Sequence, residues 1–305
     1  MDNALMLWLD GMRVHQVNAD VRTPLGNETV QTWMDMSGKK NHVIQNSAIN
    51  QPTYGSNSMV FNGSDDYMDS TDFGLDSESA IIFVVANIDP SETDDGFFIG
   101  KHSSIGENRV LVGYGGEQYS TVVMTQDLNT GAMIKGVNKI LTFEMVDSGN
   151  NVIATQFKNG MPVGIGSKTL ENVQIDNISG KPWTIGQEWD GSTTSDFVDG
   201  TLYEILVFNQ EMSDTDRYKV NYYLSQKWNL TEMVDSDDDG LFDNVDPDPI
   251  VVNAPESSFD AIVNGYSGID SVSVESNLKL WLDATKAHGL SGSPSGAPLV
   301  VADNE

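Results

Sequence analysis

A short acidic stretch near the C-terminal end, DSDDDGLFDNVD, has residue types and spacing that suit a divalent cation. Alternate residues of a tight loop can direct carboxylates to one point, and Ca²⁺ takes about six to eight oxygen ligands. In an EF-hand-like register, aspartates take the first, third, fifth, ninth and twelfth positions. A glycine takes the sixth, and the seventh residue offers its backbone carbonyl. The predicted ligands are Asp235, Asp237, Asp239, Leu241, Asp243 and Asp246.

The last of these positions differs from the usual pattern, because Asp246 stands where a longer glutamate would reach the ion with both oxygens. Asp248 is a further candidate ligand. Without a cation, five crowded carboxylates repel each other. We therefore expect calcium to convert a loose acidic tether into a stiff joint. The alternative, a solvated acidic linker, is disfavoured by the regular spacing.

Two other segments carry candidate ligand residues. Asp65 and Asp66 lie in the turn NGSDDYMD, where a second metal could sit beside a ligand site. Trp189 precedes Asp190 in a polar loop, and an exposed indole there could stack on a sugar ring. For Asp65 and Asp66 the favoured interpretation is a turn with solvated acids. For Trp189 it is a tryptophan folded over the edge of the domain.

The sequence contains no arrangement typical of an active site. Glycoside hydrolysis uses paired carboxylates, which alternate residues of one strand would present on one face, whereas Glu144 and Glu204 each stand alone. Cysteine is absent. We therefore expect no enzyme. The four histidines are scattered without metal-like spacing: His15, His42, His102 and His288. His15 and His288 lie 273 residues apart, as equivalent positions of two copies would, and are expected to be structural.

The region before the acidic stretch predicts an all-β fold. AIIFVVANI, residues 80–88, is apolar throughout, as expected of a strand buried on both faces. Asn159-Gly160 predicts a two-residue hairpin turn, and GTLYEILVFN, residues 200–209, predicts a last long strand. Many short strands without helices between them indicate an antiparallel jelly-roll β-sandwich.

One helix is predicted at the end of this region. Ser213 and Asp216 resemble a capping box, with an acid in the first turn. Val220, Leu224 and Trp228 then follow at helical spacing, so this face should pack against the sheet.

The charge is strongly negative, with 45 Asp and Glu against 16 Lys and Arg, and a net charge of −29. Such a surface disfavours nucleic acid and anionic membranes as partners. We found no apolar run long enough to span a membrane and no signal-peptide pattern. The lack of cysteine points to a bacterial or archaeal source, and we expect the chain to be a piece of a longer protein.

Four motifs resemble bacterial laminin-G-like domains of the concanavalin A-like jelly-roll group: LMLWLD, VQTWMDMSGKKNHV, QPTYGSNSMVFNGSDDYMD and GTLYEILVFNQEMSDTDRYKVNYYLSQKWNL. They occur in the family's order over residues 4–230. The acidic stretch resembles thrombospondin type 3 calcium repeats. The resemblance implies the fold and calcium as cofactor, but leaves the ligand open, because such domains bind sugars, bind proteins or space other domains.

The opening phrase LMLWLD returns as LKLWLD, at an offset of 273 residues that aligns Trp8 with Trp281 and Asp10 with Asp283. This repeat predicts a tandem array with four segments here. They are a sandwich (1–231), a calcium loop (232–250), a linker (251–275) and the first strand of a second, truncated repeat (276–305).

The function expected from these observations is that of a non-catalytic, extracellular adhesion or structural module on a bacterial or archaeal surface, with a calcium-stiffened linker. Its partners would be a glycan or a surface protein, and neighbouring repeats of the same protein. One alternative is a lectin-type carbohydrate-binding module attached to a polysaccharide-degrading enzyme. Another is a filament subunit that self-assembles when the terminal strand, residues 278–283, takes the first-strand position in a neighbouring molecule.

Overall fold

The computed structural model describes residues 4–14, 16–17, 20–21, 23–70, 73–75, 79–103, 109–175, 180–190 and 192–252. They belong to one compact unit, Met1–Val252. The terminal repeat, with Trp281, Asp283 and His288, lies outside the described residues, and so does His15.

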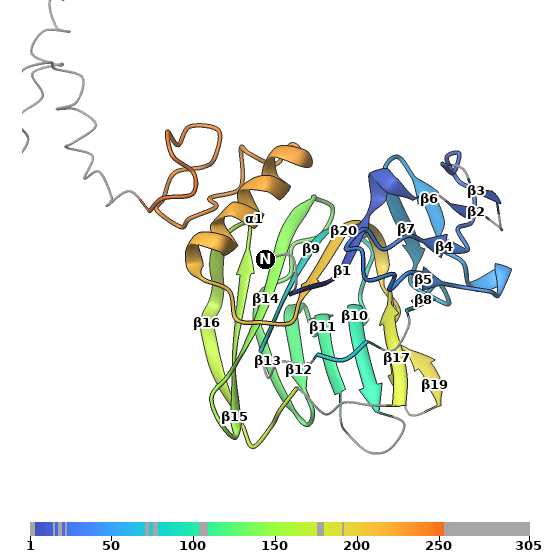
Figure 1. Ribbon diagram of the computed structural model, residues 1–305, viewed down its shortest axis with the longest axis horizontal. Helices are drawn as coiled ribbons and strands as arrows, with labels where there is room; N and C mark the ends of the chain where they lie inside the picture. Colours follow the sequence, from blue (N-terminus) through green and yellow to red (C-terminus); the bar gives the residue numbers. More distant parts are fainter. Residues whose placement is uncertain are drawn as a thin grey trace, which may run out of the picture. The chain divides into compact units, whose positions relative to one another are not determined.

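The strands form two antiparallel sheets and a small ribbon (Figure 1). The first sheet contains β1 (Leu5–Asp10), β6 (Thr53–Gly55), β7 (Ser58–Asn62), β9 (Ala80–Ile88), β14 (Lys139–Asp147), β15 (Asn151–Lys158), β16 (Met161–Glu171) and β20 (Asp199–Phe208). The second contains β2 (Gln16–Val17), β3 (Asp20–Val21), β4 (Thr32–Trp33), β5 (Val43–Ile44), β8 (Met68–Asp69), β10 (Gly96–Ser103), β11 (Arg109–Gly115), β12 (Gln118–Val123), β13 (Gln126–Ala132) and β17 (Gly180–Ile185). The ribbon is β18 (Glu188–Asp190) with β19 (Thr193–Ser195).

The strand order is β16-β15-β14-β9-β20-β7-β6 in the first sheet, with β1 paired to β20. In the second it is β13-β12-β11-β10-β17-β8-β5-β4-β2-β3. Short 3-10 helices occur at Gly11–Arg13 (η1) and Ala48–Asn50 (η2), and the α-helix in the described residues is α1, Asp214–Lys227. The predicted antiparallel β-sandwich with one helix is confirmed.

The strand β9 is buried on both faces, as its apolar sequence predicts. Ile82 and Val84 belong to the main core between the sheets. Ile81 and Phe83, one residue out of phase, belong to a second cluster that includes Leu224 of α1. Because side chains alternate along a strand, β9 presents one apolar face to the second sheet and the other to α1.

The predicted hairpin is also present, joining β15 to β16. Asn159 and Gly160 have φ angles of 54° and 89°. Both turn positions are therefore left-handed, which is why asparagine and glycine occupy them.

Helix α1 starts as its sequence predicts, because the Ser213 hydroxyl accepts a hydrogen bond of 3.2 Å from the Asp216 N–H. Leu224 is fully buried, with Val220 and Trp228 packed beside it. A polar stripe that sequence reasoning missed is buried as well: Arg217, Asn221 and Ser225.

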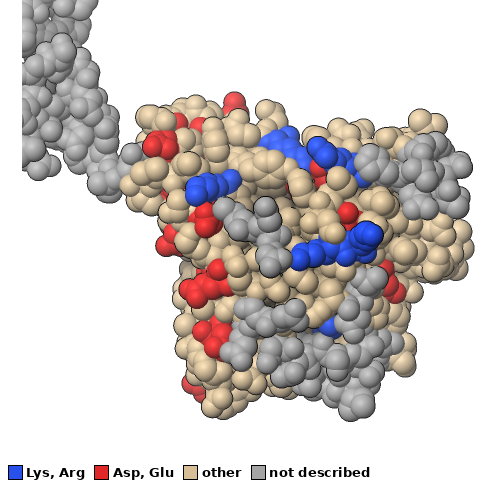
Figure 2. All heavy atoms as spheres, in the orientation of Figure 1, with Lys and Arg blue, Asp and Glu red and all other residues tan. Residues whose placement is uncertain are grey.

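The described helices include none with the length and apolar character of a membrane-crossing helix. On the face drawn in Figure 2, acidic side chains are scattered toward one margin, and most of the few basic ones lie over the middle.

Candidate functional site

The acidic loop after α1 is seated on the β15–β16 turn. The Asp235 N–H donates to the Asn159 carbonyl at 3.0 Å. A Cβ on Gly160 would meet the Asp235 carbonyl oxygen at 1.7 Å, so only glycine allows this approach. The loop thus contacts the sandwich at a point that is distant in sequence.

Three of the predicted ligands converge. Asp235, Asp237 and Asp239 can each direct one carboxylate oxygen so that all three lie within 4.8 Å of one another. The backbone turns through Asp238 and Gly240, with φ of 62° and 97°. This chain reversal brings alternate aspartates to one point.

The backbone of the turn positions two of these carboxylates. Asp235 accepts hydrogen bonds from the Asp239 N–H at 3.2 Å and from the Gly240 N–H at 2.9 Å. Asp239 accepts one from the Leu241 N–H at 2.9 Å. Their oxygens are therefore held in place by the loop itself.

Asp237 differs, because it is 1% exposed and neither of its carboxylate oxygens has a hydrogen-bond partner within the described residues. Burial raises its pKa to about 7, and the charges of Asp239, Asp246 and Asp235 raise it further. A buried carboxylate without a donor is costly unless a cation compensates its charge. The buried carboxylate of Asp237, which has no hydrogen-bond donor among the described residues, therefore suits coordination of a cation.

Asp246 and Asp248 complete the acidic surroundings. Asp246 is 9% exposed and accepts a hydrogen bond from the Asp248 N–H at 2.8 Å. Burial raises the pKa of Asp246, and Asp239 adds to the effect. The Asp246 carboxylate thus lies close enough to Asp239 for their negative charges to interact.

Asp243 has a different arrangement from its neighbours. Its Oδ1 accepts the Ser236 N–H at 2.9 Å, and its Oδ2 accepts the hydroxyls of Ser236 and Ser225. These bonds fasten the loop to α1. Its role as a ligand, like that of the Leu241 carbonyl, stays a prediction.

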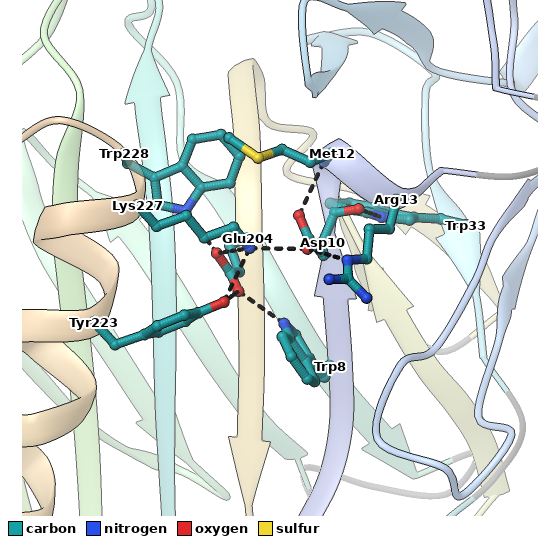
Figure 3. Close-up of polar contacts among 9 residues, drawn as sticks. All are labelled: Trp8, Asp10, Met12, Arg13, Trp33, Glu204, Tyr223, Lys227 and Trp228. Carbon is teal, nitrogen blue, oxygen red and sulfur yellow. Dashed lines mark hydrogen bonds and ion pairs between the residues drawn. The ribbon is translucent and has the colours of Figure 1, made fainter.

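A second cluster of polar residues, which we call the Glu204 cluster, joins β1, β20 and α1 (Figure 3). Glu204 is fully buried and accepts hydrogen bonds from Trp8 Nε1 at 2.7 Å, Trp228 Nε1 at 2.6 Å and the Tyr223 hydroxyl at 3.3 Å. Lys227 Nζ lies 2.8 Å from the same carboxylate. Both carboxylate oxygens of Glu204 therefore accept hydrogen bonds.

Lys227 also reaches Asp10, at 2.9 Å, so one ammonium joins two buried carboxylates. Burial raises the pKa of Glu204, although Lys227 opposes this shift. Burial lowers the pKa of Lys227, but its bonds to Glu204 and Asp10 outweigh that effect and raise it. The arrangement places one ammonium between two buried carboxylates and joins β1 and β20 to α1.

Sequence reasoning missed this cluster because it considered Glu204 only along its own strand. Asp10 stands directly opposite Glu204 in the β1–β20 register. The available signal was the pattern WLD in the first strand and KW at the end of the helix, which supply Trp8, Asp10, Lys227 and Trp228.

The turn with Asp65 and Asp66 is hydrogen-bonded within itself. The Asn62 amide oxygen accepts the N–H groups of Ser64 and Asp65, and Asp66 accepts the Asn62 N–H at 3.1 Å. Burial raises the pKa of Asp66 to about 7. This geometry favours the turn interpretation over a second metal site.

Trp189 is half-buried in β18, while Asp190 is exposed. Its ring meets Tyr67 edge to face at 5.9 Å, which favours a tryptophan folded over the sandwich. The contact brings the two lesser candidate segments side by side, since Tyr67 follows Asp66. Among the histidines, His42 accepts the Asp35 N–H at 2.9 Å, which is a structural role.

No protein-family model matches the sequence, and no curated protein matches it either. Solved structures do match. The sialidase of Trypanosoma rangeli in complex with 2,3-difluoro-KDN is 14% identical, with a TM-score of 0.51, over 74% of this chain and 33% of the sialidase. The likeness is one of fold. The same sialidase with 2,3-difluorosialic acid gives 14% identity and a TM-score of 0.51, over 73% and 33% of the two chains.

The sialidases are much longer than the region they share with this chain, which spans about a third of their length. A smaller neighbour is the CBM40 of the Ruminococcus gnavus IT-sialidase bound to α2,3-sialyllactose. It is 14% identical, with a TM-score of 0.40, over 48% of this chain and 84% of that one. This similarity is too distant to carry an argument about ligands.

Proposed function

We propose that the chain is a non-catalytic, extracellular adhesion or structural module of the laminin-G-like type, followed by a thrombospondin type 3-like calcium loop. The observation that supports calcium most directly is Asp237, whose two buried oxygens lack hydrogen-bond partners within the described residues. Carboxylate oxygens are the preferred ligands of this hard cation.

In this proposal Asp235, Asp237 and Asp239 hold the ion, with Asp246 and the Leu241 carbonyl as further ligands. The bound charge offsets the repulsion among the aspartates. Because the loop is bonded to Asn159 in the hairpin and to Ser225 in α1, calcium stabilises the attachment of the loop to the sandwich. Whatever follows residue 252 would then leave the domain from a fixed point.

The non-catalytic part of the proposal is supported by the Glu204 cluster. Glu204 and Asp10 are the buried carboxylates of facing strands, and a general acid or base needs access to substrate. Both are instead bonded to Lys227, and Glu204 is fully buried. Their arrangement serves to join strands.

Calorimetric titration with CaCl₂ tests the calcium site on wild type, Asp237→Asn and Asp238→Asn. Asp238 is an exposed residue of the same loop, so its variant is a control with the same loss of charge. We expect one ion per chain in wild type, at least a tenfold loss of affinity in Asp237→Asn, and a smaller loss in the control. Equal affinity in wild type and Asp237→Asn, or no binding to wild type, would contradict the proposal.

A further inference from the structure

The second sheet has a cleft on the face that points away from the core. Val110 and Val112 of β11 lie in the core between the sheets, so Arg109 and Leu111 point to the opposite face. A hollow of about 320 Å³ lies on that face. Gly115 and Gly116 line it and leave space because they carry no side chain.

The floor of this cleft is apolar. Phe97, Leu111 and Val122 form a small hydrophobic cluster separate from the main core. Phe97 and Val122 line the cleft directly. Each of these two residues is less than a tenth exposed, so they present a small apolar area at the base of the cleft, between polar walls.

One wall carries carboxylates and one guanidinium. Glu188 is 4% exposed, and its Oε1 is 3.2 Å from Arg109 Nη1. Its Oε2 is buried and accepts no hydrogen bond from the described residues. Burial raises the pKa of Glu188 to about 7; Arg109 opposes the shift and Asp196 adds to it. Glu188 Oε2 therefore has the Asp196 carboxylate near it but no hydrogen-bond donor among the described residues.

Asp196 and Asp95 extend this wall, and both line the cleft. Asp196 has a φ of 48°, in the left-handed region, and its backbone carbonyl accepts the Phe97 N–H at 3.2 Å. Asp95 accepts the Gly116 N–H at 2.9 Å. Backbone contacts therefore fix both residues relative to the floor.

The opposite end is lined by polar side chains of β12 and β13: two amides, a hydroxyl and a carboxylate, from Gln118, Asn129, Ser120 and Asp127. Amides and hydroxyls both donate and accept hydrogen bonds, as sugar hydroxyls do. Polar groups at both ends of an apolar strip match the polar rim and apolar face of a pyranose ring.

We infer that this cleft binds a neutral oligosaccharide, with sugar hydroxyls donating to the carboxylates of Glu188 and Asp196 and the ring lying over Phe97 and Val122. Four carboxylates against Arg109 repel uronates and sialic acids. A cationic ligand is disfavoured at the Glu188 end, because Arg109 already occupies Oε1 there. The inference is independent of the calcium loop, which lies on the β15–β16 turn.

Calorimetry and a glycan array test this with cellohexaose, xylohexaose, mannohexaose and galactohexaose as neutral probes. Hexagalacturonate and 3′-sialyllactose serve as anionic probes, and hexalysine as a cationic one. The variants are Glu188→Gln, Gln118→Ala and Asn129→Ala. The last two residues are exposed, so these changes should leave folding intact. Glu171→Gln and Gln174→Ala are matched controls at exposed positions outside the cleft.

We expect at least one neutral probe to bind, with affinity reduced about tenfold in Glu188→Gln and several-fold in the alanine variants. The controls should bind like wild type, with and without calcium. Binding of anionic or cationic probes alone, binding of none of the probes, or neutral binding that the cleft variants leave unchanged would each overturn the inference.

Discussion

Glu204 of β20 and Trp228, which follows α1, are joined by a hydrogen bond of 2.6 Å from the indole Nε1 to the carboxylate Oε2. Trp8 donates to the other oxygen of the same carboxylate. Two tryptophans from opposite ends of the domain thus share one buried acid. The motifs at the start and end of the domain therefore form one contact.

Glu204→Gln should destabilise the domain by about 3 kcal/mol, because it leaves Lys227 with one buried carboxylate in place of two. Urea denaturation followed by tryptophan fluorescence measures this. Glu211→Gln, at an exposed position before the helix, is the control and should be neutral. Equal stability of wild type and Glu204→Gln would show that the cluster does not stabilise the fold.

Gly160→Ala should weaken calcium binding by at least about tenfold, since its Cβ would overlap the Asp235 carbonyl and push the loop off the hairpin. Gly166→Ala is the matched control: it has a φ of 75°, similar to the 89° of Gly160, but no atom lies within 4 Å of its Cβ. Calorimetry on both separates backbone strain from displacement of the loop. Similar calcium affinity in both variants would mean that the close contact between Gly160 and Asp235 does not support the calcium site.

The stability of the calcium-free protein should depend on Asp237 with a defined sign. Its pKa rises from the usual 3.8 to about 7 in the folded chain, so the folded state binds a proton that the unfolded state has lost. The free energy of unfolding therefore falls as pH rises through this window, and the loss is complete above it.

Asp237→Asn should consequently stabilise the calcium-free protein at pH 8, on the order of 2 kcal/mol, and less at pH 5. With calcium the order should reverse, because wild type gains more stability from the ion than the variant does. Thermal melts at both pH values, with and without EGTA, measure this, and the exposed Asp94→Asn is the control. If Asp237→Asn is less stable than wild type at pH 8 in EGTA, burial of the charged Asp237 carboxylate does not destabilise the calcium-free protein, and the prediction is wrong.

Gly11→Ala tests the strand-exchange alternative. A Cβ on Gly11 would lie 2.3 Å from the Asn57 carbonyl oxygen and 2.9 Å from that of Tyr203, and the terminal repeat carries Ala284 at this position. We expect Gly11→Ala to cost about 2 kcal/mol or more, and Gly26→Ala, which has open space around it, to be neutral.

A costly Gly11→Ala would mean that residues 278–283 fit the β1 position only if the chain changes course after Asp283. Light scattering on the full chain and on a chain without residues 276–305 completes the test. A neutral Gly11→Ala, together with an oligomer lost on deletion, would instead support self-assembly through this strand.

Local sequence determined much of the fold. The apolar run of β9, the Asn159-Gly160 turn and the Ser213 cap are each specified by a few neighbouring residues, so they could be predicted. The loop register is local in the same way, and it predicted the convergence of Asp235, Asp237 and Asp239.

The tertiary structure alone decided which distant residues meet. Asp10 faces Glu204 because β1 pairs with β20, and Arg109 meets Glu188 because β18 lies beside β10, the strand that pairs with β11. It also placed the acidic loop on Gly160 and joined Asp243 to Ser225 of α1. Sequence periodicity reports the face of one strand, whereas these contacts depend on strand order and register, which form only when the sheets close over their core.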